Sequence, residues 1–164
     1  MKLCGRVAVK LGDNIDTDII YPGRYLNITD REKTPEHLFE LAYPDIRTRL
    51  KPGDIIVAGK NFGCGSSREQ ATAAVKFAGV GAVVAVSFAR IFYRNSINLG
   101  LPLVTSREAP AQLEEGDEIE IDLTGGSVRK LPGGAVLAAA PLDARAVELL
   151  NAGGLIPYLR KKYA

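Results

Sequence analysis

Tryptophan is absent from this 164-residue chain, and histidine and methionine occur only once each. The two cysteines, Cys4 and Cys64, are too few for a disulfide framework and too far apart in sequence for a metal cluster. We therefore expect Cys64 to be a small packing residue. The single histidine, His37, has no second histidine or cysteine close by, so it is expected to serve packing or the surface. No metal site is expected in this chain.

Long hydrophobic runs are also missing. No stretch approaches the ~20 apolar residues that a membrane-spanning helix needs. The first residues run directly into a strand pattern and do not resemble a signal peptide, so we expect a cytoplasmic protein without membrane contact. The net charge of +2 is small, and no run of Lys and Arg is interleaved with aromatics. Nucleic acid is therefore not an expected partner.

What remains is the composition of an ordinary globular protein, with 46% hydrophobic and 24% charged residues. A chain of this length can bury a real core, and no linker divides it, so we expect one domain over residues 1–164. The first two thirds predict strands at 2–10, 54–59, 81–86 and 101–104, with helices at 71–78 and 87–96. The alternation over residues 54–104 indicates parallel strands with right-handed crossovers.

The last third has a different pattern. Residues 118–123 alternate as an edge strand, and glycine pairs predict hairpins that lead to a strand at 136–140. Asp143 is expected to cap a helix over 144–151, and a second helix ends in the basic tail. A short helix is expected at 35–41, after a mobile polar stretch at 27–33. Together the segments predict an α/β fold.

The residues that organise the chain are 61–70, with the sequence NFGCGSSREQ. They connect a buried strand to a helix, and Ser67 with Gln70, or Ser66 with Glu69, fits a capping box. The free N–H groups of a helix start, together with Arg68, favour an anion. A plain glycine-rich turn is the alternative. The lysine of a Walker loop and the serine elbow of hydrolases are both absent.

An early loop over residues 12–26 holds Asp16, Thr17 and Asp18 among other polar residues. A calcium loop would need a regular ligand series that ends in a glutamate, and none follows. The loop is then either a set of Asx turns that cap the backbone or a polar wall of a substrate site. The residues alone leave both interpretations open.

Three motifs occur along the chain in the order DTDIIYPGRYL at 16–26, FGCGSSRE at 62–69 and SFARIFYRNS at 87–96. This set resembles the 3-isopropylmalate dehydratase small-subunit family, the swivel domain of the aconitase superfamily. The resemblance implies an aconitase-like swivel domain with a mixed β-sheet, a barrel-like core and flanking helices. It also implies a large subunit as partner, which holds a [4Fe–4S] cluster through its own cysteines.

The resemblance further implies roles for particular residues. Ser66 matches the catalytic base, which moves the proton on the carbon next to a carboxylate. Ser67 and Arg68 match contacts to a substrate carboxylate. The supporting residues are expected in the early loop and the central turn: Asp16, Thr17, Asp18 and Gly65. The reaction is expected to be the isomerisation of 2-isopropylmalate to 3-isopropylmalate through dehydration and rehydration.

The resemblance also implies that the substrate side group faces the residues after Tyr25-Leu26. A homoaconitase would be expected to carry arginine there, but this chain has Asn27 and Ile28. Ile28 offers an apolar contact for a branched alkyl group, which favours isopropylmalate or a dimethylmalate over homocitrate. Arg24 and Arg31 lie close by in sequence, so a homoaconitase small subunit stays open.

Two interpretations from other classes remain. The same helix start could serve a stand-alone anion- or nucleotide-binding module, or the chain could be a purely structural subunit. Arg90 and Arg94 share one face of the helix expected at 87–96. The sequence does not distinguish whether either arginine supports the site.

Overall fold

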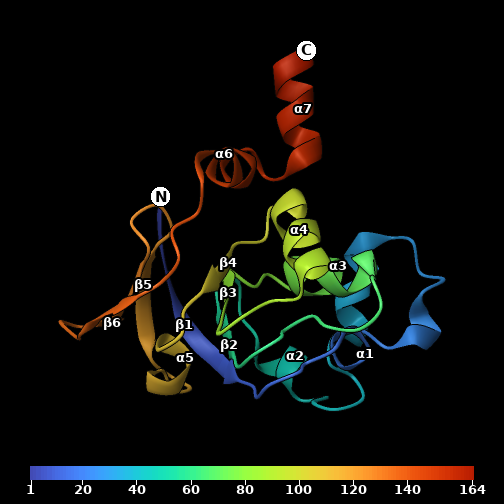
Figure 1. Cartoon of the computed structure of the whole chain (residues 1–164). Helices are drawn as coiled ribbons and strands as arrows, with labels where there is room; N and C mark the ends of the chain where they lie inside the picture. Colours follow the sequence, from blue (N-terminus) through green and yellow to red (C-terminus); the bar gives the residue numbers. More distant parts are fainter.

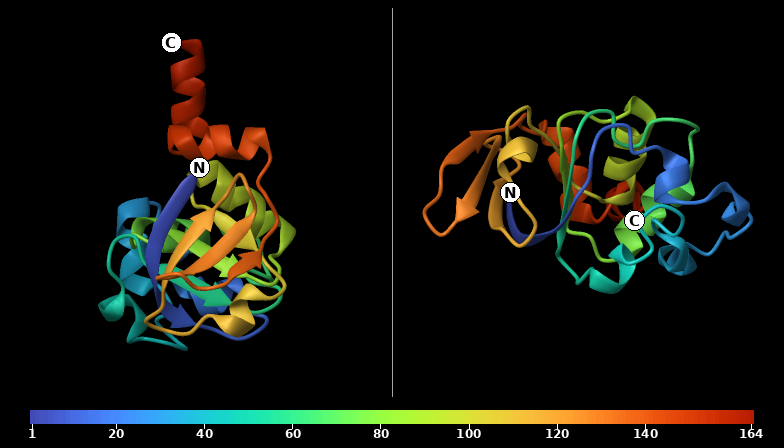
Figure 2. Two further views of the ribbon diagram at one scale, coloured as in Figure 1. Left: turned by 90° about the vertical axis from the view of Figure 1, so that its left-hand side faces the viewer. Right: turned by 90° about the horizontal axis from the view of Figure 1, so that it is seen from below.

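The computed structural model describes all residues from Met1 to Ala164. Its centre is a seven-stranded sheet with the strand order β4-β3-β2-β1-β5-β6-β7. The sheet curls as it runs from the green strands to the orange strands (Figure 2), which agrees with the expected mixed α/β fold and barrel-like core. The strands are β1 (Lys2–Lys10), β2 (Ile55–Ala58), β3 (Ala82–Ala85), β4 (Leu103–Thr105), β5 (Glu118–Asp122), β6 (Ser127–Leu131) and β7 (Val136–Ala138).

Helices flank the sheet, and α7 projects away from it at the C-terminal end (Figure 1). The α-helices are α1 (Thr17–Ile20), α2 (Ile46–Arg49), α3 (Glu69–Phe77), α4 (Arg90–Leu99), α5 (Ala109–Gln112), α6 (Ala144–Ala152) and α7 (Leu155–Tyr163). The two 3₁₀-helices are η1 (Gly23–Tyr25) and η2 (Arg31–His37). None of these helices is both long and apolar enough to pass through a lipid bilayer.

Strands β1 to β4 pair in parallel, as the alternation of strands and helices predicts. Every residue of β2 and β3 is buried, because helices α3 and α4 in the crossovers cover the sheet. The crossovers bring the loops that follow β2 and β3 to the same edge of the sheet: a bridge joins Phe62 to Phe88. This edge is where the central residues 61–70 lie.

Strands β5, β6 and β7 pair antiparallel, and β1 joins them to the parallel half. Residues of β5 alternate between buried and partly exposed, as the sequence predicts for a strand with one wet face. Asp143 accepts a hydrogen bond from the Ala146 N–H at 2.7 Å, which confirms the predicted cap of α6.

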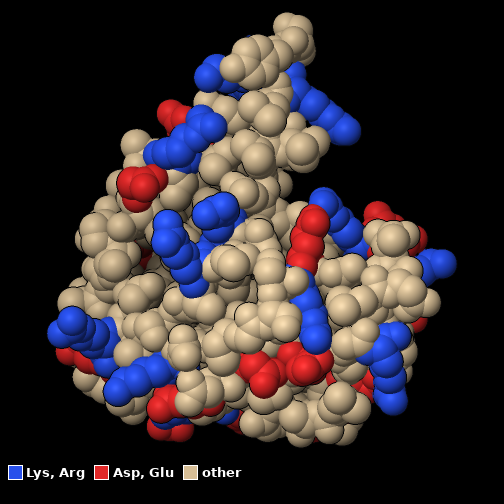
Figure 3. All heavy atoms as spheres, turned by 45° about the vertical axis from the view of Figure 1, so that its right-hand side comes forward, with Lys and Arg blue, Asp and Glu red and all other residues tan.

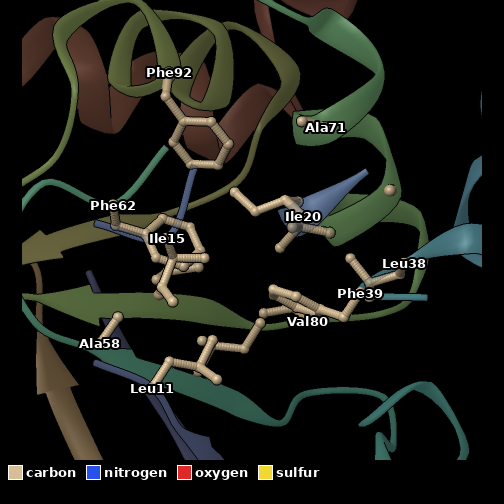
Figure 4. Packing of buried hydrophobic residues seen from close by; sticks show 14 of the residues in the cluster. Leu11, Ile15, Ile20, Leu38, Phe39, Ala58, Phe62, Ala71, Val80 and Phe92 are labelled. Atoms are coloured by element: carbon tan, nitrogen blue, oxygen red, sulfur yellow. The ribbon is translucent and has the colours of Figure 1, made fainter. Parts of the chain in front are cut away.

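Two hydrophobic clusters occupy the two faces of the sheet. The larger one holds 20 buried residues and includes Ile15, Ile20, Phe62 and Phe92, which converge below the central loop (Figure 4). Phe62 and Phe92 meet edge to face with ring centroids 5.4 Å apart. The early loop, the central loop and the start of α4 are therefore fixed to one another by the same core.

The prediction for residues 27–41 needs correction. The helical segment is η2 (Arg31–His37), so it begins earlier than the expected helix at 35–41, and it includes much of the stretch expected to be mobile. Asp30 caps η2 by accepting from the Glu32 N–H at 3.0 Å. The prediction depended on Pro35, but the helix starts at the Asp30 cap, five positions before Pro35.

Charged side chains of both signs are spread over the face shown in Figure 3, as expected for a chain with a small net charge. The same view shows α7 rising at the top, with a notch between it and the body of the protein. A groove of about 590 Å³ lies here, lined by residues of α3, α4 and α7 such as Phe77, Asn98 and Ile156.

Candidate active site

The central loop after β2 forms one wall of a pocket of about 270 Å³. The start of α4 forms another wall, and the early loop contributes Thr17. The polar residues that line this pocket are Thr17, Ser66, Ser67, Arg68, Arg90 and Asn95. Ser66 and Ser67 are exposed, so their hydroxyls are within reach of a ligand or a second protein.

Gly63 explains why the loop and α4 can lie so close together. Its φ of +83° is in the left-handed region, which favours glycine. A Cβ at this position would overlap the Phe92 ring, which is 3% exposed and belongs to the first turn of α4. The glycine therefore lets the Ser66 loop and the start of α4 share a pocket.

Thr17 fixes the backbone of the loop that carries Ser66. Its hydroxyl donates to the Ser66 carbonyl at 2.9 Å, and its N–H donates to the Cys64 carbonyl at 2.9 Å. Thr17 is 4% exposed, and Asp16 caps the helix α1 that begins with it by accepting from the Ile19 N–H at 2.8 Å. Of the residues predicted as supporting, Thr17 thus contacts the loop through two hydrogen bonds to its backbone, and Asp16 caps the helix that begins with Thr17.

Arg68 is held at its far end by the early loop. Its guanidinium pairs closely with Asp18 and also donates to the Tyr21 carbonyl at 3.4 Å. The hydrogen bond from Arg68 lowers the pKa of Asp18, with a smaller contribution from the Gly23 N–H, while partial burial opposes the shift. The Arg68 side chain is only 15% exposed, so this cation is anchored and partly neutralised before any ligand arrives.

The predicted capping box of α3 is wrong. The helix begins at Glu69 with Arg68 as its N-cap, and no side chain bonds to its free N–H groups. Arg68 is extended (φ −135°, ψ 108°), which places both serines before the cap position. The hydroxyls of Ser66 and Ser67 form no hydrogen bond within the chain and are available for chemistry. The helix expected at 87–96 begins later, at Arg90, and the hydroxyl of Ser87 accepts from the Asn61 N–H at 2.9 Å instead of capping it.

Asn27 and Ile28, predicted to contact the substrate side group, do not line the pocket of Ser66. Asn27 is exposed, and Ile28 lines a separate hollow of about 230 Å³ between η2 and α3. The segment is fixed to α3 by Gln70, whose Nε2 donates to the Leu26 carbonyl at 3.2 Å. In this arrangement the two residues flank the pocket of Ser66 and do not enter it.

Gly65, also predicted as supporting, has a φ of +91° and lies beside Thr17. His37 stacks on the Tyr25 ring with centroids 3.5 Å apart, so it packs against the early loop. Cys4 and Cys64 are both free thiols. The structure contains no group of three or more His, Cys, Asp or Glu side chains that could hold a metal ion.

Sequence reasoning missed Asn95 and left Arg90 undecided. Both line the pocket, whereas Arg94 does not. The helix α4 begins at Arg90, so Arg90 lies at the end of the helix that borders the pocket, and Arg94 lies one turn further along. The helical spacing of Ile91 and Asn95 could have indicated Asn95, since residues four apart lie on one face.

A family model described as the aconitase C-terminal domain matches residues 5–108. Among curated proteins, the chain is 54% identical over 151 residues to the 3-isopropylmalate dehydratase small subunit of Moorella thermoacetica, covering 92% of this chain and 91% of the relative. It is 51% identical over 155 residues to the isopropylmalate/citramalate isomerase small subunit of Methanocaldococcus jannaschii, covering 94% of this chain and 92% of the relative.

A solved structure gives the same result for the fold. The crystal structure of 3-isopropylmalate dehydratase from Methanocaldococcus jannaschii is similar to this structure with a TM-score of 0.89 and 42% sequence identity. The similarity covers 99% of this chain and 95% of that chain. The swivel-domain fold expected from the sequence motifs is thereby confirmed.

Proposed function

Because the chain belongs to the aconitase C-terminal domain family, we propose that it is the small subunit of a 3-isopropylmalate dehydratase, a hydro-lyase of leucine biosynthesis. The observation that carries this proposal is the identity of about half of all positions to proteins of that name, over 92% or more of the chain. Its activity requires a large subunit, and it isomerises 2-isopropylmalate to 3-isopropylmalate. Residues 1–164 act as one domain in the cytoplasm.

Ser66 is the base in this proposal. As an alkoxide, its Oγ takes the proton from the carbon next to a carboxylate, and hydroxide leaves the neighbouring carbon of 2-isopropylmalate. Addition of hydroxide to the carbon that lost the proton, with the proton returned from Ser66 to the carbon that lost hydroxide, gives 3-isopropylmalate. The exposed and unbonded hydroxyl of Ser66 and the cations that line its pocket support this role.

Ser67 and Arg68 bind a substrate carboxylate, because they line the same pocket and Arg68 keeps donors that Asp18 does not occupy. Thr17, Asp16, Asp18 and Gly65 hold the loop in place. Asn27 and Ile28 approach the substrate side group only if the segment around them moves when the large subunit closes the pocket.

The residues of this chain do not fit an iron–sulfur cluster, which needs several thiolates in one place. We place the [4Fe–4S] cluster on the large subunit, where it would act as a Lewis acid on the leaving hydroxyl. The contribution of this chain is then the proton transfer and the grip on the substrate carboxylates. Exclusion of water on closure of the two subunits would strengthen both.

The test is reconstitution with a cluster-loaded large subunit, followed by kinetics on 2-isopropylmalate, citramalate, a dimethylmalate, homocitrate and citrate. We expect no turnover by the isolated chain and the highest kcat/KM of the complex on 2-isopropylmalate. Citramalate is included because the name of one relative contains it. If the complex turned over homocitrate and none of the other four substrates, the chain would be assigned to a homoaconitase.

The alternative of an anion- or nucleotide-binding module is tested with the isolated chain. Isothermal titration calorimetry with ATP and with inorganic phosphate should give no measurable heat of binding. Tight binding of ATP, together with an inactive reconstituted complex, would favour the binding module.

A further inference from the structure

We propose that Arg90, at the start of α4, binds a carboxylate of the substrate opposite the grip of Ser67 and Arg68. The inference rests on the proposed function and extends it to a residue that neither the motifs nor the relatives' names assign. Arg90 lines the pocket of about 270 Å³ together with Ser66 and Ser67. The pocket therefore contains two arginines, and the question is which of them has its charge free for a ligand.

Arg68 has little free charge. It pairs with Asp18 and donates to the Tyr21 carbonyl, and only 15% of its side chain is exposed. Arg90, in contrast, is exposed and forms no ion pair and no side-chain hydrogen bond anywhere in the chain. The uncompensated cation of this pocket is therefore Arg90.

The place of Arg90 on its helix adds an independent argument. It is the first residue of α4, a helix of 10 residues with no acidic residue in its first turn and no capping side chain. The N-terminal end of a helix is positive, so a cation there is unfavourable. An anion in the pocket would be attracted both by the positive helix start and by the Arg90 guanidinium, and it would offset the repulsion between the two.

The chemistry of the substrate fits this arrangement. An isopropylmalate carries two carboxylates on neighbouring carbons, and the planar fork of arginine matches a carboxylate with two parallel hydrogen bonds. Ser66 precedes Arg68 by two positions in the sequence, and it lines the same pocket as Arg68 and Arg90. A dicarboxylate held at both ends would therefore present its central carbons to the Ser66 hydroxyl.

The chain offers a matched control on the same helix. Arg94 is also exposed and also lacks an ion pair, but it does not line the pocket. Replacing Arg90 or Arg94 with glutamine removes the same charge from the same helix. Only the Arg90 variant changes the pocket.

The experiment measures KM and kcat for 2-isopropylmalate with the complex of the chain and its large subunit, for wild type, Arg90→Gln, Arg90→Lys and Arg94→Gln. We expect Arg90→Gln to raise KM about 10- to 100-fold, the usual size of a lost charge-assisted hydrogen bond. Arg90→Lys should recover part of this loss, and Arg94→Gln should stay within about twofold of wild type. The dissociation constant of the two subunits, measured by biolayer interferometry, should be the same for all four.

Two results would overturn the proposal. If Arg90→Gln behaves like Arg94→Gln, the guanidinium does not bind substrate. If Arg90→Gln weakens subunit assembly and leaves KM unchanged, Arg90 contacts the large subunit instead.

Calorimetry with succinate, a plain dicarboxylate, separates this inference from the proposed function because it needs no turnover. Should the wild-type complex bind succinate without isomerising isopropylmalate, the proposed function fails, and weaker succinate binding by Arg90→Gln would still support the role of Arg90. A wild-type complex that binds no dicarboxylate would contradict both.

Discussion

Helices α3 and α4 begin at the same pocket, but their first residues are arranged in opposite ways. At α3 the arginine is the cap residue, it is tied to Asp18, and an acidic residue, Glu69, follows in the first turn. At α4 the arginine is the first helical residue, it has no partner, and no acid accompanies it. The charge of Arg68 at the α3 start has a partner within this chain, whereas the charge of Arg90 at the α4 start has none.

This difference separates scaffold from binding surface. The contacts of Asp16, Thr17 and Asp18 all converge on the loop before α3 and fix the backbone that carries Ser66. Nothing comparable holds the Arg90 side chain. We infer that the loop before α3 positions the Ser66 hydroxyl and that Arg90, at the start of α4, is free to bind the substrate.

The largest effect is expected for Ser66→Ala, which removes the chemistry of the α3 side and leaves its scaffold intact. Because a positioned base contributes about 10²- to 10⁴-fold, kcat of the reconstituted complex should fall by that factor. The hydroxyl makes no contact within the chain, so stability and assembly should not change. Steady-state kinetics and thermal denaturation check this, with Ser67→Ala as the matched variant. Equal kcat for wild type and Ser66→Ala would remove Ser66 from the role of base.

Gly63→Ala is expected to break the contact between the two helix starts. The new Cβ would overlap the Phe92 ring and would also hold a residue with a side chain at a φ of +83°. These two penalties together should lower the free energy of unfolding by about 2–4 kcal/mol and reduce kcat/KM at least tenfold.

Urea denaturation of Gly63→Ala should be compared with that of Gly12→Ala, because a Cβ at Gly12 meets nothing within 4 Å. If the two variants differed by less than about 0.5 kcal/mol, which is the usual range for neutral surface changes, the close approach of loop and helix would be in doubt.

Arg68→Gln and Asp18→Asn sharpen the comparison of the two arginines. Arg68→Gln should lower kcat/KM about 100-fold, since it removes both a substrate contact and the anchor of the loop. Asp18→Asn removes only the anchor and should lower kcat/KM about tenfold. Kinetics of both single variants and of the double variant give the coupling. Equal losses in the two single variants would mean that Arg68 acts only through Asp18.

Thr17→Val should have a smaller effect. The substitution keeps the shape of the buried side chain and removes the hydrogen bond to the Ser66 carbonyl. A neutral hydrogen bond contributes about 0.5–1.5 kcal/mol, so kcat should fall about three- to tenfold with KM little changed. A shift confined to KM would indicate that Thr17 contacts the substrate and does not position Ser66.

The smallest expected effect is on the pH dependence of stability, through the ion pair of Arg68 with Asp18. Arg68 lowers the pKa of Asp18, so the pair stabilises the fold above the unfolded-state pKa of about 3.9, and this contribution is lost as pH falls through the lower folded value. Because the Asp18 side chain is 62% exposed, the contribution should be at most about 1 kcal/mol. Asp18→Asn should therefore differ slightly from wild type in urea denaturation at pH 7 and not at pH 2. A difference that persists at pH 2 would argue against the ion pair as its cause.

The sequence alone predicts the parts of this structure that depend on local pattern. Apolar runs predict β2 and β3, alternation predicts β5, and Asp143 predicts the start of α6. The motif resemblance identifies the family and places Ser66 in an exposed loop beside a helix start. Each of these sequence signals lies in the element that it predicts or within a few residues of it.

The features that the sequence did not predict depend on contacts between distant segments. The extended backbone of Arg68, which rules out the expected capping box, accompanies the pairing of Arg68 with Asp18 in another loop. The separation of Ile28 from Ser66 follows from the path of η2 over α3. The difference between Arg90 and Arg94 depends on where α4 begins, and the first turn of α4 lies against the distant Gly63 through Phe92.

The most direct test of the account is a structure of the chain assembled with its large subunit and a bound isopropylmalate analogue. The account predicts that the large subunit closes over the pocket, with Ser66 Oγ about 3–3.5 Å from the carbon that loses its proton and the Arg90 guanidinium on a carboxylate. A complex in which this pocket faces solvent, away from the large subunit, would contradict it.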